Sequence, residues 1–317
     1  MQKEEIASAI VTGPTGVVGS ALCARLLREG IRVYAVVRPQ TKRINALPEG
    51  VNVVPCDMEE YELLPKLIGC KVDAFFHLAW GNTIGSGRND MYAQNANVRY
   101  SLDAVRAAIK LKCSVFVGIG SQAEYGRVED KLTPQTPCFP ENGYGMAKLC
   151  AGQMTRVACE QAGIRHEWVR ILSVYGPNDN SKSVISLVIR KLLRGEKPAL
   201  TEGEQKWDYL FSEDAADALW RVAKYGKHGA VYPLGGGHAC SLRTYIEILR
   251  DEIDPMLELG FGEIPYGPYQ VMYLEADITA LQQDTGFVKM TSFREGIKQT
   301  IEQIKRDEHI WTKKAVE

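Results

Sequence analysis

Short apolar runs alternate along the first half of the chain with longer segments in which apolar positions recur at helical spacing. The apolar runs predict strands at Ile6–Thr12, Arg32–Val37, Val51–Pro55, Val72–Ala79, Ser114–Ile119 and His166–Leu172. The segments between them predict helices at Ser20–Arg28, Leu63–Ile68, Asn89–Leu111 and Tyr144–Ala162. Because these strands are apolar throughout, we expect a parallel sheet with helices on both faces, which is a doubly wound α/β fold.

The alternation weakens after Tyr175. Beyond it we predict helices at Val184–Leu193, Asp214–Lys224, Leu242–Ile253 and Phe293–Lys305, and short strands at Tyr209–Phe211 and Ala230–Leu234. We therefore expect a doubly wound domain over residues 1–175 and a smaller C-terminal α/β part over residues 176–317. The chain is expected to interleave between the two, and the smaller part to cover the crevice of the sheet.

Composition excludes some classes of protein. The 38 Lys and Arg residues balance 39 Asp and Glu, so the formal net charge of −1 argues against binding nucleic acid or an acidic membrane by bulk charge. No apolar run is long enough to cross a membrane and no basic leader starts the chain, so we expect a cytoplasmic protein. The eight cysteines form no CxxC pair, which predicts reduced, buried thiols and no metal site.

A glycine-rich turn, TGPTGVVG, follows the first predicted strand and opens the first predicted helix. In a doubly wound fold, glycines at the spacing of Gly13, Gly16 and Gly19 let the backbone approach the pyrophosphate of a dinucleotide. The N-terminus of the helix then favours the negative charge. We therefore interpret residues 1–175 as an NAD(P)-binding Rossmann domain.

The end of the second strand bears on which dinucleotide binds. An NAD site usually carries Asp or Glu there, to hold the ribose hydroxyls. This strand is followed instead by Arg38, with Lys42 and Arg43 close behind. Because a guanidinium suits a 2′-phosphate, we predict a preference for NADP(H), with NAD(H) as the alternative.

A YxxxK motif starts the fourth predicted helix, where Tyr144 and Lys148 are one turn apart and share a face. Ser121 follows the fifth strand, at the carboxyl edge of the sheet where doubly wound folds bind ligands. The ordinary pKa of tyrosine is about 10, and Lys148 together with an oxidised nicotinamide would lower it. Tyr144 is thus suited to exchange a proton as acid or base, while Ser121 holds the reacting oxygen.

These motifs, in this order, resemble the extended branch of the short-chain dehydrogenase/reductase superfamily, the nucleotide-sugar epimerases, dehydratases and reductases. The resemblance covers nearly the whole chain and rests on TGPTGVVG, Asp57-Met58, HLAW at 77–80, Asn97-Val98, SQAEYG at 121–126, YGMAK at 144–148, RILSVYGP at 170–177 and WDY at 207–209.

The resemblance implies catalysis by Ser121, Tyr144 and Lys148. It implies cofactor contacts at Gly13, Thr15, Gly16, Val17, Val18, Gly19, Arg38, Asp57, Met58, Leu78, Ala79, Trp80, Asn97, Tyr144, Lys148, Leu172 and Val174. It implies substrate contacts at Trp80, Ser121, Gln122, Ser173 and Trp207. It also implies a homodimer built on the two long helices, with Met154, Val157 and Cys159 as candidates to face the partner.

Four positions depart from the family pattern. Dehydratases carry Asp-Glu after the catalytic hydroxyl, whereas this chain has Gln122-Ala123, so the second acid–base pair of a 4,6-dehydratase is missing. Epimerases often carry Asn where this chain has Ser173. The arginine that commonly contacts the substrate diphosphate aligns with Trp207, so the sequence does not identify the group that holds the pyrophosphate.

Our leading interpretation is an NADP(H)-dependent reductase of a nucleotide-diphosphate 4-keto-6-deoxyhexose, because the basic end of the second strand favours NADPH and NADPH suits net reduction. The first alternative is a nucleotide-sugar 4-epimerase with tightly bound NAD. The second is a reductase of a non-nucleotide carbonyl. A redox-sensing module that binds NADP without turnover is a different class, and the presence of both Tyr144 and Lys148 argues against it.

Overall fold

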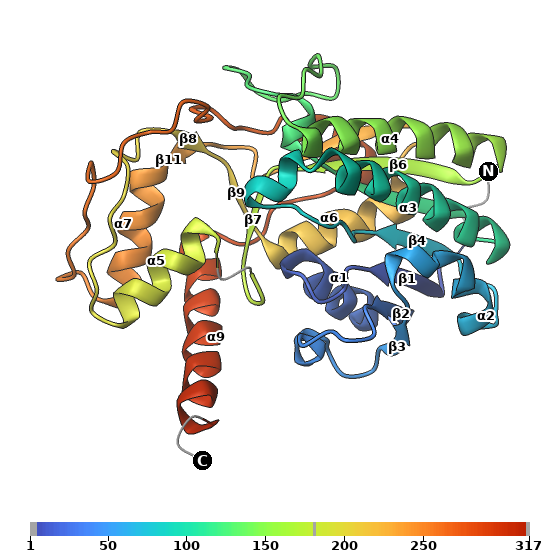
Figure 1. The fold of residues 1–317 in the computed structure, drawn as a ribbon, viewed down its shortest axis with the longest axis horizontal. Coiled ribbons are helices and arrows are strands. Elements are labelled where there is room, and N and C mark those ends of the chain that lie inside the picture. The colour runs from blue at the N-terminus through green and yellow to red at the C-terminus, as the bar shows by residue number, and fades with distance from the viewer. Residues whose placement is uncertain (1–4, 180–181, 315–317) are drawn as a thin grey trace.

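The computed structural model describes residues 5–179 and 182–314, and its centre is a seven-stranded parallel sheet (Figure 1). The strands run in the order β10-β6-β5-β4-β1-β2-β3. Their bounds are β1 Ser8–Thr12, β2 Arg32–Val37, β3 Asn52–Pro55, β4 Ala74–His77, β5 Val115–Ser121, β6 Arg165–Ile171 and β10 Val231–Leu234. The prediction of a doubly wound parallel sheet is confirmed.

Both faces of the sheet are buried under helices. Successive strand residues point to opposite faces, so Ile10 and Phe75 pack into one apolar cluster while Val11 and Phe76 pack into the other. The first face is covered by α2 (Leu64–Ile68), α3 (Met91–Lys110) and α4 (Gly143–Gln161). The second face is covered by α1 (Val17–Arg28), α6 (Ser212–Tyr225) and α8 (Thr279–Thr285). Figure 1 shows α3 beside α4 and α1 beside α6.

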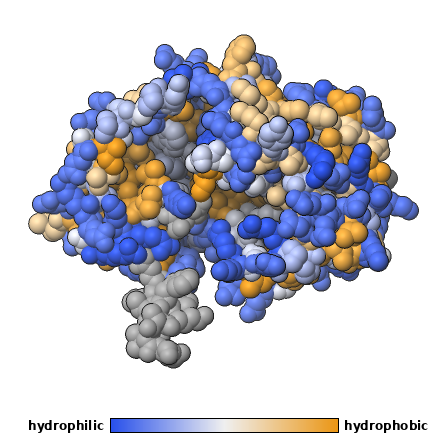
Figure 2. Space-filling view, in the orientation of Figure 1, coloured by the Kyte–Doolittle hydropathy of each residue, from blue (hydrophilic) through white to orange (hydrophobic). Residues whose placement is uncertain are grey.

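The smaller part of the molecule is built on three helices that share an apolar cluster. These are α5 (Val184–Leu193), α7 (Leu242–Ile253) and α9 (Phe293–Lys314), which Figure 1 shows apart from the sheet. Two short strand pairs join the parts: β7 (Ser173–Tyr175) with β9 (Tyr209–Phe211), and β8 (Lys206–Trp207) with β11 (Cys240–Ser241). Figure 2 shows a largely hydrophilic face, with hydrophobic residues gathered over α5 and α7.

Strand register brings several loop starts to one edge. Thr12 pairs with His77, and His77 pairs with Gly118, so β1 and β4 end side by side while β5 runs on to Ser121. The loops after these strands therefore meet at the carboxyl edge of the sheet. This is the edge at which open α/β sheets bind ligands.

The observed elements depart from the sequence prediction at the N-caps of helices and in short elements that the prediction omitted. Helix α1 begins at Val17 rather than Ser20, because Gly16 is its N-cap. Helix α3 begins at Met91 rather than Asn89, because the Asp90 side chain accepts the Ala93 N–H as N-cap. The prediction omitted β7, β8, β11, α8 and the 3-10 helices η1 (Ile44–Ala46), η2 (Met58–Leu63), η3 (Gly85–Asn89) and η4 (Gln122–Glu124).

All eight cysteines are free, but burial differs from the prediction. Cys70 and Cys150 are exposed, so the expectation of buried thiols is wrong for them. Cys159 is buried in the apolar cluster between α4 and the sheet, so it cannot face a partner subunit. Met154 and Val157, on the same helix, are exposed.

Candidate active site

The glycine-rich turn between β1 and α1 leaves the first turn of the helix open. Gly13 has a φ of +66°, and a Cβ on Gly19 would lie 2.2 Å from the Gly13 carbonyl oxygen, so the turn closes onto the helix only with glycine there. Gly16 is the N-cap of α1, and this end has neither a side-chain cap nor an acid in its first turn. Its N–H groups and the helix dipole suit a pyrophosphate. The other predicted contacts in this turn, Thr15, Val17 and Val18, are partly buried.

The carboxyl end of β2 carries no acidic side chain. Arg38 follows the strand directly and is exposed. Beyond it, the Arg43 guanidinium donates to the carbonyl of Asn178. After β3, the Asp57 carboxylate accepts the Met58 N–H at 2.7 Å and caps η2.

The loop after β4 is tied to its neighbours by two side chains. The Thr12 hydroxyl accepts the N–H groups of Leu78 and Ala79 at 3.1 and 3.2 Å. Asn97, on α3, accepts the Gly81 N–H at 2.9 Å and donates its amide to the Gly81 carbonyl at 3.2 Å. Asn97 was predicted to contact the cofactor. Its side-chain amide holds the loop that carries Leu78, Ala79 and Trp80, three other predicted cofactor contacts.

Helix α4 begins close against the end of β5. Asn142 is its N-cap and accepts the Gly145 N–H at 2.9 Å. A Cβ on Gly145 would lie 2.2 Å from the Ala123 carbonyl oxygen, so glycine permits this approach. The approach places Tyr144, the second residue of α4, beside Ser121.

Tyr144, Lys148 and Trp80 form a compact group at this edge. The Lys148 ammonium is buried and donates to the Ile119 carbonyl at 2.6 Å. It lies 3.9 Å from the centroid of the Trp80 ring and 5.9 Å from that of Tyr144. The Trp80 and Tyr144 rings meet edge to face, with centroids 6.2 Å apart. The predicted catalytic residues are therefore brought together, and Trp80 lies among them.

Burial and nearby charges shift the pKa values of Tyr144 and Lys148. Burial raises the pKa of Tyr144 above its ordinary value, while hydrogen bonding with Ser121 and the positive charge of Arg88 oppose the rise. Burial lowers the pKa of Lys148 to about 7, and the Glu124 carboxylate counteracts part of that effect. A buried ammonium with a pKa near neutrality is the kind of perturbed group that gathers at functional sites.

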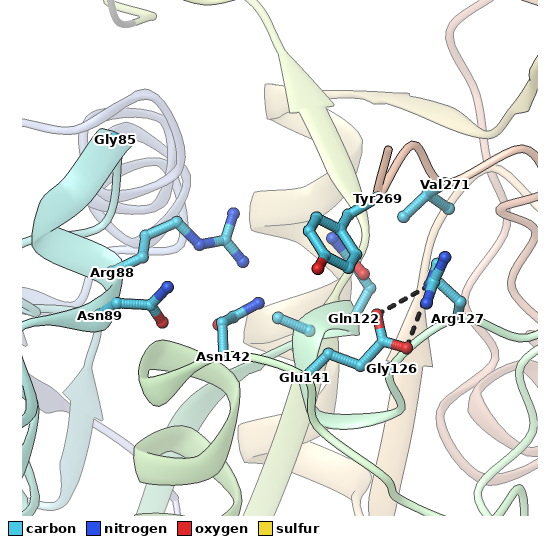
Figure 3. Close-up of a pocket in the computed structure, with 11 residues that line it drawn as sticks. Gly85, Arg88, Asn89, Gln122, Gly126, Arg127, Glu141, Asn142, Tyr269 and Val271 are labelled. Carbon is cyan, nitrogen blue, oxygen red and sulfur yellow. Dashed lines mark hydrogen bonds and ion pairs between the residues drawn. The ribbon is translucent and has the colours of Figure 1, made fainter. Parts of the chain in front are cut away.

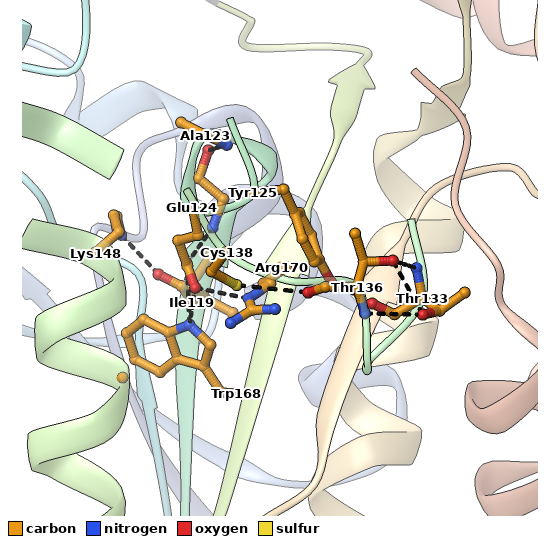
Figure 4. Close-up of polar contacts among 12 residues, drawn as sticks. Ile119, Ala123, Glu124, Tyr125, Thr133, Thr136, Cys138, Lys148, Trp168 and Arg170 are labelled. Atoms are coloured by element: carbon orange, nitrogen blue, oxygen red, sulfur yellow. Dashed lines mark hydrogen bonds and ion pairs between the residues drawn. The ribbon is translucent and has the colours of Figure 1, made fainter. Parts of the chain in front are cut away.

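Glu124, whose charge acts on Lys148, lies in a buried polar network (Figure 4). Its carboxylate accepts the Ser121 N–H at 2.8 Å and the Arg170 Nε at 2.6 Å. The Trp168 indole donates to the two carboxylate oxygens at 3.0 and 3.2 Å. Ser121 in turn caps η4, so the network fixes the backbone that presents the Ser121 hydroxyl.

A pocket of about 640 Å³ lies near the group of Tyr144, Lys148 and Trp80, and Figure 3 shows its lining, which does not include Ser121, Tyr144 or Lys148 themselves. Its lining includes Gln122 of η4 and Arg88 of η3, whose guanidinium lies 4.8 Å from the centroid of the Tyr144 ring. Arg127 and Glu141 form an ion pair on the other side, at 2.8 Å, and Arg127 lies over the Tyr269 ring. The lining of the pocket therefore carries fixed charges.

Ser173 and Trp207, predicted substrate contacts, lie in contact. The Trp207 indole donates to the Ser173 hydroxyl at 2.7 Å. Leu172 is buried and its N–H donates to the Leu234 carbonyl at 2.9 Å, while Val174 is partly buried against the core of the sheet. These residues lie where the chain passes from β6 towards the smaller part of the molecule.

Of the pocket lining, only Gln122 was a predicted site residue. The polar and charged residues that the sequence reasoning missed include Arg88, Asn89, Arg127, Glu141, Asn142 and Tyr269. One signal was present, because the glycine-rich segment 81–87 follows the fourth predicted strand and Arg88 comes directly after it. Nothing in the sequence places Tyr269 near Arg127, since the two are far apart along the chain.

Among the described residues, no cluster of His, Cys, Asp and Glu is arranged to hold a metal ion. No helix in the same part of the chain has both the length and the apolar character needed to span a membrane.

Known proteins resemble this chain along nearly its whole length. The Bacillus subtilis (strain 168) protein described as "Uncharacterized UDP-glucose epimerase YtcB" is 25% identical over 314 residues, covering 92% of this chain and 96% of that protein. The structure of UDP-glucose 4-epimerase with UDP-glucose from Thermotoga maritima superposes with a TM-score of 0.86 at 21% identity, covering 95% of this chain and 99% of the other. MoeE5 in complex with UDP-glucose and NAD gives a TM-score of 0.81 at 25% identity, with 95% and 99% covered.

The model of one protein family matches residues 9–235, which include all but the first residue of the central sheet and also include Ser121, Tyr144 and Lys148. The resemblance to extended short-chain dehydrogenases/reductases is thereby confirmed. The chain is an enzyme of this type, and it belongs to the NAD dependent epimerase/dehydratase family.

Proposed function

We propose that the protein is a nucleotide-sugar 4-epimerase, which inverts the hydroxyl at C4 of a nucleotide-diphosphate hexose with NAD retained in its site. One observation carries the proposal: Ser121, Tyr144 and Lys148 are gathered at the sheet edge, and the part of the chain that the structure describes places no second acid–base pair beside them. Gln122 and Ala123 cannot exchange protons, and the Glu124 carboxylate is engaged by Trp168 and Arg170. The arrangement suits oxidation and reduction at one carbon and does not suit elimination.

The turn at the start of α1 fits the pyrophosphate of NAD. The nearest heavy atom to a Cβ built on Gly16 is the Gly13 carbonyl oxygen at 3.6 Å, so the space beyond Gly16 is open. When bound, NAD would supply the acceptor and donor of the hydride. Residues Gly13, Gly16, Gly19 and Lys148 would hold it, together with the loop after β4.

The side chains of this chain would move and hold the proton. Tyr144 accepts the proton of the C4 hydroxyl and later returns it, and its hydrogen bond with Ser121 and the positive charge of Arg88 favour the ionised phenol. Ser121 hydrogen bonds to the same substrate oxygen and stabilises the charge that develops there. The pocket near Tyr144 gives the sugar room to present either face of C4 to the cofactor.

The proposal is tested with Tyr144→Phe. Wild-type protein should invert C4 of a UDP-linked or dTDP-linked hexose or hexuronic acid, as in the interconversion of UDP-glucose and UDP-galactose, without net consumption of a dinucleotide. The variant should lose about 100-fold to 10,000-fold in turnover, the range for a general acid or base. Mass spectrometry should find NAD in both proteins. Tyr92→Phe, on an exposed residue of α3, is the matched control and should keep full activity. Equal activity in wild type and Tyr144→Phe would contradict the proposal.

A second candidate is the NADP(H)-dependent reductase of a 4-keto-6-deoxyhexose nucleotide. Arg38, exposed at the end of β2 where an acid would favour NAD, supports it. This enzyme should purify with an empty site, bind NADPH more tightly than NADH and consume it stoichiometrically. Retained NAD would contradict it. The homodimer and the cytoplasmic location stay predictions.

A further inference from the structure

Arg88 carries a positive charge that points into the pocket (Figure 3). Within residues 5–179 and 182–314, no carboxylate forms an ion pair with it, and its contact is the Tyr144 ring at 4.8 Å. Arg127, the other arginine of the pocket, is already paired with Glu141. Arg88, Arg127 and Glu141 together leave the lining with one uncompensated positive charge.

The neutral side chains near Arg88 also present donors. The amide oxygen of Asn89 accepts the Gly143 N–H at 3.0 Å, and that of Asn142 accepts the Gly145 N–H at 2.9 Å. Because each oxygen is engaged by the backbone, each side chain offers its NH₂ group to the pocket. Figure 3 shows both amide nitrogens on the side that faces Arg88. A guanidinium and two amide NH₂ groups that converge in this way match a ligand with several acceptor oxygens and a negative charge.

We propose that this pocket binds a carboxylate on the sugar ring, so that the substrate is a nucleotide-linked hexuronic acid. The inference rests on the proposed function, in which Tyr144 acts at C4. The carboxylate of a hexuronic acid is attached to C5, the neighbour of C4, and so lies beside the reacting carbon. The diphosphate is attached to C1, which lies across the ring from C4 and therefore away from this pocket.

The test compares acidic and neutral ligands on the NAD-loaded protein. Affinities for UDP-glucuronate and UDP-glucose are measured by calorimetry. The dTDP-linked pair is measured in parallel, so that a preference for one nucleobase does not decide the result. Wild-type protein should bind the acid about tenfold to a hundredfold more tightly than the neutral sugar, as expected for a hydrogen-bonded charge pair. Arg88→Gln should abolish that ratio, and Arg88→Lys should retain part of it because the charge remains but the planar fork is lost.

Arg99→Gln is the matched control. Arg99 also lies over a tyrosine ring, that of Tyr100 at 5.0 Å, but outside the pocket, so its variant should keep the wild-type ratio. If Arg88 acts only on Tyr144, Arg88→Gln will shift the pH profile with both ligands and leave the affinity ratio unchanged. That result would overturn the proposal, as would a wild-type protein that prefers the neutral sugars or binds neither class.

Turnover separates this proposal from the function on which it rests. Tight binding of the acid that depends on Arg88, without inversion at C4, would refute the epimerase and leave the carboxylate site standing. Inversion of neutral sugars without preference for the acid would refute the carboxylate site and leave the epimerase standing.

Discussion

Replacing Glu124 with glutamine should destabilise the fold far more than the same change in an exposed ion pair. The Glu124 side chain is fully buried, and that of Arg170 is 4% exposed, so neither charge can be solvated by water. One carboxylate oxygen accepts from Ser121 and Trp168, and the other accepts from Arg170 and Trp168. A glutamine must turn its NH₂ group towards either the Ser121 N–H or the Arg170 guanidinium, and both are donors.

The expected loss of stability follows from the positive charge of Arg170, which Glu124→Gln leaves buried without a counter-charge. Removing one partner of a buried ion pair costs about 3–5 kcal/mol, because the other charge stays buried without compensation. The glutamine oxygen still accepts from one side, so we expect a loss of about 3 kcal/mol in the free energy of unfolding. Urea unfolding of the cofactor-free protein, followed by circular dichroism, measures it.

Glu141→Gln is the control for this prediction. Its ion pair with Arg127 is 42% and 44% exposed on the two side chains, so the change should cost about 0–1 kcal/mol. A double variant, Glu124→Leu with Arg170→Met, should be more stable than Glu124→Gln, since buried ion pairs can be replaced by apolar residues at little cost. If Glu124→Gln costs no more than Glu141→Gln, the buried network is not the support of Ser121 that its geometry indicates.

Two further predictions concern the glycine turn and a buried histidine. Gly19→Ala should disrupt the turn, because its Cβ would lie 2.2 Å from the Gly13 carbonyl oxygen. Gly16→Ala should fold normally and lose NAD affinity, because its Cβ meets no protein atom closer than 3.6 Å. Urea unfolding measures the stability of both variants, and calorimetry measures their affinity for NAD. Burial lowers the pKa of His77 to about 3, so the folded state keeps it neutral while the unfolded state binds a proton below about 6.5. Stability should therefore fall as the pH drops from about 6.5 towards 3, at up to about 1.4 kcal/mol per pH unit, and His77→Gln should fall less steeply. If the free energy of unfolding in urea falls with pH at the same slope in wild type and in His77→Gln, the prediction is wrong.

The sequence was most informative where periodicity or a motif fixes the structure. Strand β2 and helices α5 and α7 have the predicted bounds, because apolar residues repeat regularly through each of them. Ser121, Tyr144 and Lys148 were found because two of them share one turn of a helix and the third ends a central strand.

Other features depend on contacts between distant segments, and the sequence could not show them. The strands β7, β8 and β11 have two or three residues, too few to display a period. The pocket joins Arg88 to Tyr269 through loops whose paths no local pattern fixes. Cys159 was expected to face a partner because periodicity does not distinguish a sheet-facing helix position from an interface position.

Strand β10 affects how the protein can be made in the cell. The edge of the sheet beside β6 is completed by residues 231–234, and α1 is covered by α6 at residues 212–225. While the chain is being synthesised, β6 therefore has an unpaired edge and α1 an uncovered apolar face until some sixty further residues have followed β6. An open strand edge is a template for pairing with other chains. The protein is thus most exposed to aggregation, and most in need of a chaperone, while only its N-terminal half has been synthesised.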